Sequence, residues 1–242
     1  MKRVKSYSGN IVYGLHTVLA VLKHQPDRAK KLLVARTSDH DELVTMARKQ
    51  GVSFEQVDRD YLQRTFDVSS DAQGVVLQCA PFAYADLDQL IEHHKRLLVL
   101  DSWQDSANLG RAARAALCFG ADGIVICHDR SASITAASEK AAVGALAQVP
   151  VARVVNLAQA LKKIKEAGFF AYGADERGEV SLKDCDFAPK VALVIGQEGA
   201  GLRSLTKKSC DVLVRIPMAS PDICLNAADT ALIMLYELSS LT

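Results

Sequence analysis

Hydrophobic and polar positions alternate along the chain with two different periods, and the change of period separates helical from strand-like segments. In the first part of the chain, the pattern predicts two helices and three strands. The helices are expected over residues 12–22, with Val12, Leu15, Val18, Leu19 and Leu22 on one face, and over 41–50, capped by Ser38 or Asp39. The strands are expected over 31–36, 52–57 and 74–79. These elements are enough to close a small α/β domain.

A second α/β region begins with the apolar run at 97–101, which is typical of a strand buried on both faces. Further strands are expected over 123–127, 191–195 and 211–216, and helices over 86–94, 109–119 and 158–166. A final helix is expected to carry Leu225, Ala228, Leu232 and Leu235 on one face. Strands that alternate with helices imply a mostly parallel sheet. The sequence therefore predicts an α/β fold with a small domain over 1–78, a linker over 79–94 and a larger domain over 95–242.

The charge of the chain changes this picture only through its distribution. Hydrophobic residues make up 49% of the 242 residues, and the formal net charge is +1. Residues 1–36, however, hold eight Lys or Arg and a single acidic residue, Asp27. The basic residues are Lys2, Arg3, Lys5, Lys23, Arg28, Lys30, Lys31 and Arg36. Such a segment is typical of a phosphate-contacting surface, although charge alone favours a solvated face.

The cysteines and histidines predict neither disulfides nor a metal site. No two of the six cysteines have CxxC spacing, and the six histidines form no ligand pattern or catalytic triad. We therefore expect reduced, mostly buried thiols. The sequence has no secretory segment after Met1 and no apolar run long enough to span a membrane, so we expect a soluble, cytoplasmic protein without a metal or a membrane partner.

Polar residues gather at three junctions that follow predicted strands, which is where ligands bind in parallel α/β sheets. The first junction, residues 100–114, contains Asn108, Gly110, Arg111 and Arg114. Asn108 offers donors and acceptors, and an arginine near the start of a helix can bind a phosphate or a developing oxyanion. For this junction alone, an ordinary helix with surface arginines is the favoured alternative.

The second junction, residues 194–203, is a loop with three glycines (Gly196, Gly199 and Gly201) between a strand and a helix. Its spacing is that of neither a dinucleotide-binding nor a triphosphate-binding loop. Glu198 within the loop would repel phosphate, so a cofactor with a positive centre fits better. A plain glycine-rich turn is an equal alternative for this segment.

The third junction, residues 215–226, is stiffened by Pro217 and Pro221 and leads into the last helix. We expect Asn226 one turn inside that helix, where an amide among apolar residues needs a reason. A helix cap or a local backbone hydrogen bond is the equal alternative to a functional role.

Together, the three junctions resemble the three motifs of the SpoU/TrmH family of RNA methyltransferases, in the SPOUT class. The matching residues are Asn108, Gly110 and Arg114 for Asn-x-Gly-x-x-x-Arg; Gly196, Glu198, Gly199 and Gly201 for Gly-x-Glu-Gly-x-Gly; and Ile216, Pro217, Met218, Leu225 and Asn226 for Ile-Pro-Met…Ser-Leu-Asn. The segments around 13–16 and 73–75 resemble the family's N-terminal RNA-binding domain. The resemblance covers nearly the whole chain.

The resemblance implies an S-adenosyl-L-methionine-dependent enzyme that methylates a ribose 2′-hydroxyl of structured RNA. It also implies a deep trefoil knot in the methyltransferase domain and a homodimer. The two-domain layout is most similar to members that act on a guanosine of 23S ribosomal RNA. The implied cofactor-binding residues are Gly196, Gly199, Ile216, Met218 and Leu225, and the implied catalytic residues are Arg114, Asn108, Glu198 and Asn226. Arginine is a poor general base, so Arg114 is expected mainly to bind phosphate and stabilise the emerging alkoxide.

Some positions depart from the family pattern. Cys224 and Ala228 stand where serines are usual, Ala147 replaces a glutamate, and Ala72 replaces a histidine. Two rivals therefore stay open: a transfer-RNA ribose methyltransferase, and a non-catalytic RNA-binding protein with the same fold. A nucleotide-dependent enzyme outside RNA biology is disfavoured because the phosphate fingerprints are missing.

Overall fold

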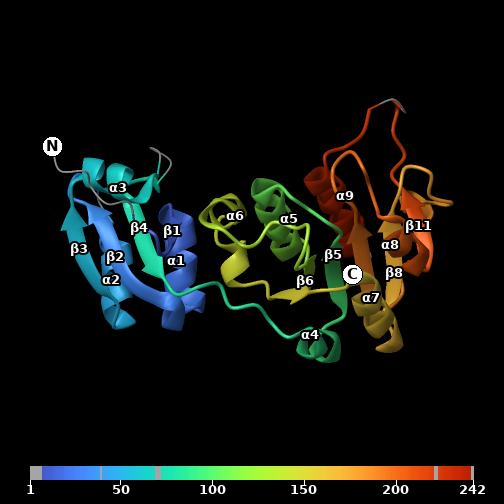
Figure 1. The fold of residues 1–242 in the computed structure, drawn as a ribbon, viewed down its shortest axis with the longest axis horizontal. Coiled ribbons are helices and arrows are strands. Elements are labelled where there is room, and N and C mark those ends of the chain that lie inside the picture. Colours follow the sequence, from blue (N-terminus) through green and yellow to red (C-terminus); the bar gives the residue numbers. More distant parts are fainter. Residues whose placement is uncertain (1–6, 39, 69–71, 221–222, 241–242) are drawn as a thin grey trace. The chain divides into compact units, whose positions relative to one another are not determined.

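The computed structural model describes residues 7–38, 40–68, 72–220 and 223–240, and the chain divides into two compact units (Figure 1). The first unit holds residues 1–83 together with 134–148, and the second holds 84–133 together with 149–242. The chain therefore passes from one unit to the other three times. Each unit has its own β-sheet, and each is described separately.

The first unit is built on a four-stranded mixed sheet with the strand order β1-β4-β2-β3. Its elements are β1 (Asn10–Tyr13), α1 (Leu15–His24), η1 (Pro26–Arg28), β2 (Ala29–Ala35), α2 (Asp41–Lys49), β3 (Ser53–Val57), α3 (Arg59–Phe66), β4 (Val75–Cys79), α6 (Ala136–Ala142) and η3 (Ala145–Ala147). β4 pairs antiparallel with both β1 and β2, whereas β2 and β3 run parallel. Buried residues of α1 and α2 pack on one face of the sheet, and buried residues of α3 pack on the other.

A buried ion pair fixes the segment 134–148 within this first unit. The guanidinium of Arg28 contacts both carboxylate oxygens of Glu139, at 2.5 and 3.0 Å, and both side chains are more than 90% buried. Burial lowers the pKa of Arg28, but the hydrogen bond and the charge of Glu139 outweigh it and hold that pKa above its ordinary value. The hydroxyl of Thr17 also donates to the backbone oxygen of Glu139. The pairing explains how a charged residue can lie inside the fold at this point.

The second unit contains a seven-stranded sheet with the strand order β7-β6-β5-β10-β8-β11-β9, in which every pair is parallel. Its elements are α4 (Leu87–His93), β5 (Arg96–Leu100), α5 (Ser106–Cys118), β6 (Gly123–Cys127), β7 (Val151–Val154), α7 (Leu157–Glu166), β8 (Phe170–Ala174), β9 (Val180–Ser181), η4 (Leu182–Asp184), β10 (Val191–Ile195), α8 (Ser204–Ser209), β11 (Val212–Arg215) and α9 (Ala227–Ser240). The predicted α/β fold class with a parallel sheet is confirmed.

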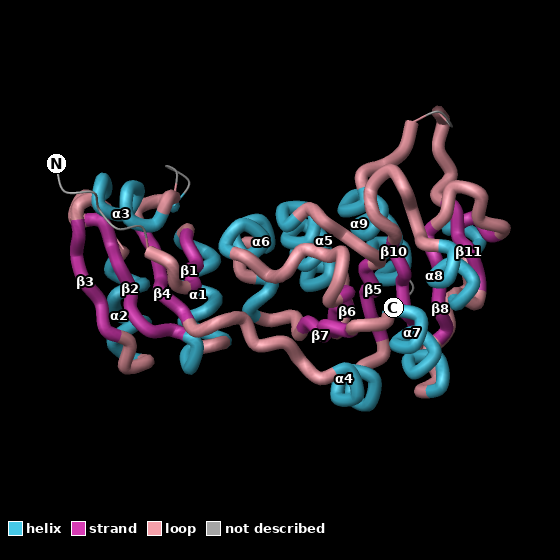
Figure 2. The backbone as a smooth tube through the Cα atoms, viewed as in Figure 1, coloured by secondary structure: helices cyan, strands magenta, loops and turns pink. Residues whose placement is uncertain are grey.

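The central strands are apolar throughout because helices cover both of their faces. Leu97 and Val99 of β5 pack with buried residues of α4 and α7 in one core cluster. α9 packs on β10 and against α5, which itself contacts β6, and these contacts cover the other face (Figure 2). Since all seven strands are parallel, their carboxyl ends share one edge of the sheet. The three junctions expected from the sequence follow β5, β10 and β11, so they meet at this edge.

The structure corrects the predicted elements at several places. Val12 lies in strand β1, because Gly14 adopts a φ of +87° and ends the strand before α1 begins. The N-cap of α2 is His40 rather than Ser38, and Asp39 lies outside the described residues. Leu225 precedes α9 instead of lying on its apolar face. The sequence pattern also missed elements of both units; these are α3, α6, α8, β1, β7, β8, β9 and the 3-10 helices η1, η3 and η4.

Two expectations drawn from composition also need correction. Arg28 cannot belong to a phosphate-contacting face, because it is buried against Glu139. Lys31 is engaged by Glu55 at 2.7 Å, while Lys2, Arg3 and Lys5 lie outside the described residues. The part of the basic segment that is free to meet a ligand is therefore smaller than the sequence indicated.

The cysteines are all free thiols, but of the six only Cys79 and Cys127 are buried.

Candidate functional site

The loop after β5 begins with a buried, polar turn that orients the start of α5. Asp101 and Trp103 are almost fully buried, and the indole Nε1 of Trp103 donates to the backbone oxygen of Ile195 at 3.1 Å. The carboxylate of Asp105 caps α5 by accepting from the backbone N–H groups of Ala107 and Asn108. These bonds place the side chain of Asn108, which is 3% exposed, beneath the loop that follows β10.

Three polar residues from the three junctions meet in one hydrogen-bonded cluster. Oε2 of Glu198 accepts from Nδ2 of Asn108 at 3.0 Å and from Nδ2 of Asn226 at 2.9 Å. Arg111, one turn along α5, donates to Oδ1 of Asn108. The carboxylate is thus held through one oxygen, and its Oε1 accepts no hydrogen bond from the residues that the structure describes. These three residues were predicted from the sequence as catalytic candidates, and in the structure they are in hydrogen-bond contact.

The glycine loop between β10 and α8 is closed tightly on itself. A Cβ on Gly196 would lie 2.1 Å from the backbone carbon of Gly201 and 2.3 Å from the nitrogen of Leu202, so only glycine fits there. Gly199 and Gly201 have φ values of +79° and +66°. The loop returns to the sheet at Arg203, whose backbone N–H and guanidinium both donate to the buried carboxylate of Asp101. These hydrogen bonds therefore hold the end of the glycine loop against the residue that follows β5.

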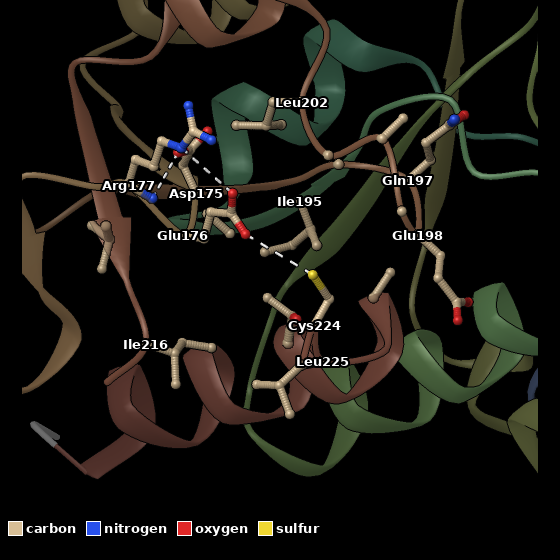
Figure 3. A pocket seen from close by; sticks show the side chains of 18 of the residues that line it. Asp175, Glu176, Arg177, Ile195, Gln197, Glu198, Leu202, Ile216, Cys224 and Leu225 are labelled. Atoms are coloured by element: carbon tan, nitrogen blue, oxygen red, sulfur yellow. Dashed lines mark hydrogen bonds and ion pairs between the residues drawn. The ribbon is translucent and has the colours of Figure 1, made fainter. Parts of the chain in front are cut away.

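A cavity of about 330 Å³ lies against this loop at the carboxyl edge of the sheet (Figure 3). All five residues expected to bind a cofactor line it: Gly196, Gly199, Ile216, Met218 and Leu225. The segment 174–177, at the end of β8, also lines the cavity; the sequence pattern did not indicate it because the strand β8 was itself not predicted. If β8 had been recognised as a strand, the polar residues directly after it would have been the sequence signal for this part of the cavity.

One side of the cavity carries carboxylates that are paired with cationic side chains. Glu176 points into it, and its carboxylate lies 3.9 Å from the thiol of Cys224 (Figure 3). Glu176 also lies 3.6 Å from Nε of Arg177, and Asp175 is engaged by Nζ of Lys207 at 2.6 Å. Glu198 and Gln197 line the cavity through the glycine loop, while their side chains extend away from Cys224 and Leu225 (Figure 3). The lining thus combines apolar side chains and backbone groups with carboxylates and with two cations, Arg177 and Lys207.

The third junction contributes Asn226 in two ways. Its Oδ1 accepts from the backbone N–H of Ala228 at 2.8 Å, and its Nδ2 donates to Glu198. Asn226 therefore lies just before α9, not one turn inside it, and both the capping alternative and the contact with the second junction hold. Pro221, expected to stiffen this junction, lies outside the described residues.

Arg114 is the predicted site residue that the structure leaves apart from the cluster. It lies on α5, is exposed, and makes no hydrogen bond or ion pair with any residue that the structure describes. Glu198 bonds to Asn108 and Asn226, and no contact joins it to Arg114 within the described residues. The guanidinium next to the cluster is that of Arg111.

Among the residues that the structure describes, no group of three or more His, Cys, Asp or Glu could hold a metal ion. None of the helices built from the described residues is both long enough and apolar enough to cross a membrane.

Family models and known proteins match this chain over most of its length. Residues 95–236 match the model of the SpoU rRNA Methylase family, and residues 11–85 match a domain described as RNA 2′-O ribose methyltransferase substrate binding. An uncharacterised tRNA/rRNA methyltransferase from Synechocystis is 38% identical over 95% of this chain, which spans 62% of that relative. The 23S rRNA (guanosine-2′-O-)-methyltransferase RlmB of Salmonella typhimurium is 33% identical, over 94% of this chain and 96% of its own length.

A solved structure agrees with these sequence matches. The SpoU methyltransferase AviRb from Streptomyces viridochromogenes, in complex with AdoMet, superposes with a TM-score of 0.81 at 25% identity. The alignment covers 96% of this chain and 89% of that protein. Both units of the present chain therefore have counterparts within one known architecture.

Proposed function

The chain belongs to the SpoU rRNA methylase family, and from this premise we propose that it transfers the methyl group of S-adenosyl-L-methionine to a ribose 2′-hydroxyl of RNA. The observation that carries the proposal is the cluster of Asn108, Glu198 and Asn226 beside the cavity of about 330 Å³. Three segments distant in sequence converge there, and each comes from one of the three family motifs.

The cavity fits the proposed cofactor in size and in chemistry. Its volume lies within the range of roughly 300–1,000 Å³ that is usual for small-molecule sites. Gly196 keeps the loop closed at a point that any side chain would block. Gly196, Gly199, Ile216, Met218 and Leu225 would hold the cofactor, largely through backbone atoms and apolar contact. When bound, S-adenosylmethionine supplies a methyl group on a positively charged sulfur.

The polar residues around the cavity have separate roles in this proposal. Glu198, held by two amides, presents its second oxygen as a negative charge that favours a cationic ligand. Asn108 and Asn226 are positioning residues, because they act on Glu198. Arg114 is exposed and unengaged within the described residues, so it is available to bind the target phosphate and stabilise the developing alkoxide.

The substrate we propose is a guanosine of 23S ribosomal RNA. Support comes from the Salmonella relative, which matches over both units and carries that activity in its name. Residues 11–85, which match a substrate-binding domain, would hold the RNA. A transfer RNA is the second candidate, because the more similar Synechocystis relative is named for both kinds of RNA.

The proposal extends to assembly and location. We propose a homodimer formed through α5 and α9, a trefoil knot in the second unit, and a cytoplasmic location, where ribosomal RNA is found. Support for the dimer is that α5 and α9 together leave Leu117, Leu232 and Tyr236 between 39% and 57% exposed.

The direct test is a methyl-transfer assay on purified 23S ribosomal RNA and transfer RNA with labelled cofactor, followed by mapping of the modified ribose. We expect label in 23S RNA at a guanosine 2′-oxygen. Label in transfer RNA alone would select the second candidate. Binding of both RNA and cofactor without any transfer would identify a non-catalytic member of the fold.

Replacing Arg114 tests the division of roles. In Arg114→Ala we expect transfer to fall by about 100-fold or more, since one preorganised charge at the reacting oxygen is lost. Cofactor affinity, measured by calorimetry, should stay at its wild-type value. Lys162→Ala, which removes an exposed cation from α7, serves as the control and should change neither quantity. Parallel loss of cofactor binding in Arg114→Ala would contradict the assignment.

A further inference from the structure

A second, smaller cavity of about 150 Å³ lies on the α5 side of Glu198. Glu198, Gln197 and Ala227 line both cavities, so they form the wall between them. Trp103, Gln104, Asp105 and Asn108 complete the smaller one. It is therefore built from the first junction, the glycine loop and the start of α9, and the segments 174–177 and 214–218, which line the larger cavity, do not contribute to it.

The polar groups of this smaller cavity fall into two classes. Those of Trp103, Asp105 and Asn108 are committed to Ile195, to the start of α5 and to Glu198. The carboxamides of Gln104 and Gln197 make no hydrogen bond within the part of the chain that the structure describes. Gln104 is exposed and Gln197 half-buried, so both lie at the rim. Two unengaged amides at the mouth of a rigid cavity are available for a ligand.

The size of the cavity selects which part of a nucleoside can enter. A space of about 150 Å³ accommodates a single ring of benzene size but no fused pair of rings with a sugar attached. The ribose is a single ring, and under the proposed function it must come next to the cofactor pocket. Its base would then remain at the rim. There a carboxamide, with a donor beside an acceptor, can pair with the edge of an unstacked base.

We propose that this second cavity is the subsite of the target nucleoside, in which the ribose enters beside Glu198 while Gln104 and Gln197 bind the edge of its base. The inference rests on the proposed function and deepens it, because it makes these two glutamines the residues that select the nucleotide. Gln104 lies in the first junction and Gln197 occupies a variable position of the glycine-loop motif, and the sequence pattern assigned a role to neither.

The test uses Gln104→Met and Gln197→Met, because methionine keeps the length of glutamine and removes its hydrogen bonds. Substrates are stem-loops carrying the mapped methylation site, with G, A, C or U at the target position. For each variant we expect kcat/KM on the preferred nucleotide to fall by about 5- to 150-fold. The differences in kcat/KM among the four nucleotides should become smaller. The KM of the cofactor should not change. Gln89→Met, on α4 at the opposite edge of the sheet, is the matched control.

An independent readout is fluorescence, because Trp103 is the only tryptophan of the chain and lines the cavity. Adding the substrate stem-loop in the presence of S-adenosylhomocysteine should change its emission. A stem-loop in which a flexible spacer replaces the target nucleotide should not.

Three results would overturn the inference. Unchanged kcat/KM and nucleotide preference in both variants would remove the glutamines from recognition. A raised cofactor KM with unaltered RNA kinetics would assign the cavity to the cofactor's amino-acid tail. Identical emission changes with both stem-loops would place the nucleoside elsewhere. Absence of transfer to any RNA by the wild-type protein is a separate outcome, because it refutes the proposed function itself.

Discussion

At the scale of single residues, the most informative group is the carboxylate of Glu198. Two amides donate to one of its oxygens, which fixes the orientation of the group without neutralising its charge. An amide network around a carboxylate is a means of holding a negative charge next to a ligand. The family motifs indicated all three residues, but only the structure shows that the two asparagines act on the glutamate and not on Arg114.

Replacing Glu198 by glutamine should separate charge from hydrogen bonding. In Glu198→Gln we expect affinity for S-adenosylmethionine to fall about two- to fivefold, because an exposed charge contributes at most about 1 kcal/mol. Affinity for S-adenosylhomocysteine, which has no positive sulfur, should hardly change. Calorimetric titration with both ligands measures the difference, and Glu166→Gln on α7 is the control. Equal losses for both ligands would mean that Glu198 contributes shape rather than charge.

At the scale of elements, the glycine loop between β10 and α8 depends on one residue for its closure. In Gly196→Ala the new Cβ would meet backbone atoms of Gly201 and Leu202, which cannot rotate away. We expect cofactor affinity to fall by about tenfold or more and stability to fall by about 1–3 kcal/mol.

Gly199→Ala is the matched comparison within the same loop. Its φ of +79° makes a side chain strained, but nothing lies within 4 Å of the added atom. It should therefore lose about 1–2 kcal/mol of stability and keep cofactor affinity near the wild-type value. Thermal melts and cofactor titrations measure the stability and the cofactor affinity of both variants. Similar cofactor affinities in the two variants would show that closure of the loop does not shape the cavity.

Elements with an unambiguous pattern could be predicted from sequence, and those set by tertiary contacts could not. β6 and β10 are continuous apolar runs between helices, and their predicted bounds match the structure. β8 was missed because Gly173 and two alanines, which are depleted in strands, occupy three of its five positions. The true role of Val12 as a strand residue depends on pairing with Leu77, which is distant in sequence. In the candidate site, the motifs indicated Asn108, Glu198 and Asn226, which the structure brings into contact, whereas the pattern did not indicate the lining segment 174–177.

At the scale of the whole molecule, a buried ion pair that no sequence pattern indicated joins the segment 134–148 to Arg28 of the first unit. Glu139 lies between β6 and β7 in the chain, yet it pairs with Arg28 inside the first unit. Glu139→Ala would leave the Arg28 guanidinium buried and unpaired, so we expect the first unit to lose about 3–5 kcal/mol of stability. Chemical denaturation followed by circular dichroism measures this loss. Glu55→Ala, which removes the exposed partner of Lys31, should cost at most about 1 kcal/mol. Similar values for the two variants would mean that the buried pair does not hold the segment 134–148 in place.

The proposed homodimer can be tested on the face that α5 and α9 present together. Leu232 and Tyr236 of α9 are 45% and 57% exposed, and the ring of Tyr236 packs edge-on against Phe119 at 5.7 Å. Apolar side chains left in water cost free energy that a second copy would recover, whereas a buried, unpaired carboxylate would oppose association. We therefore expect the wild-type protein to have the mass of a dimer by light scattering, and the double variant Leu232→Glu, Tyr236→Glu to have that of a monomer. Leu205→Glu removes a more exposed leucine, on α8, and should leave the dimer intact. A monomeric wild-type protein, or dissociation by Leu205→Glu alone, would contradict assembly through this face.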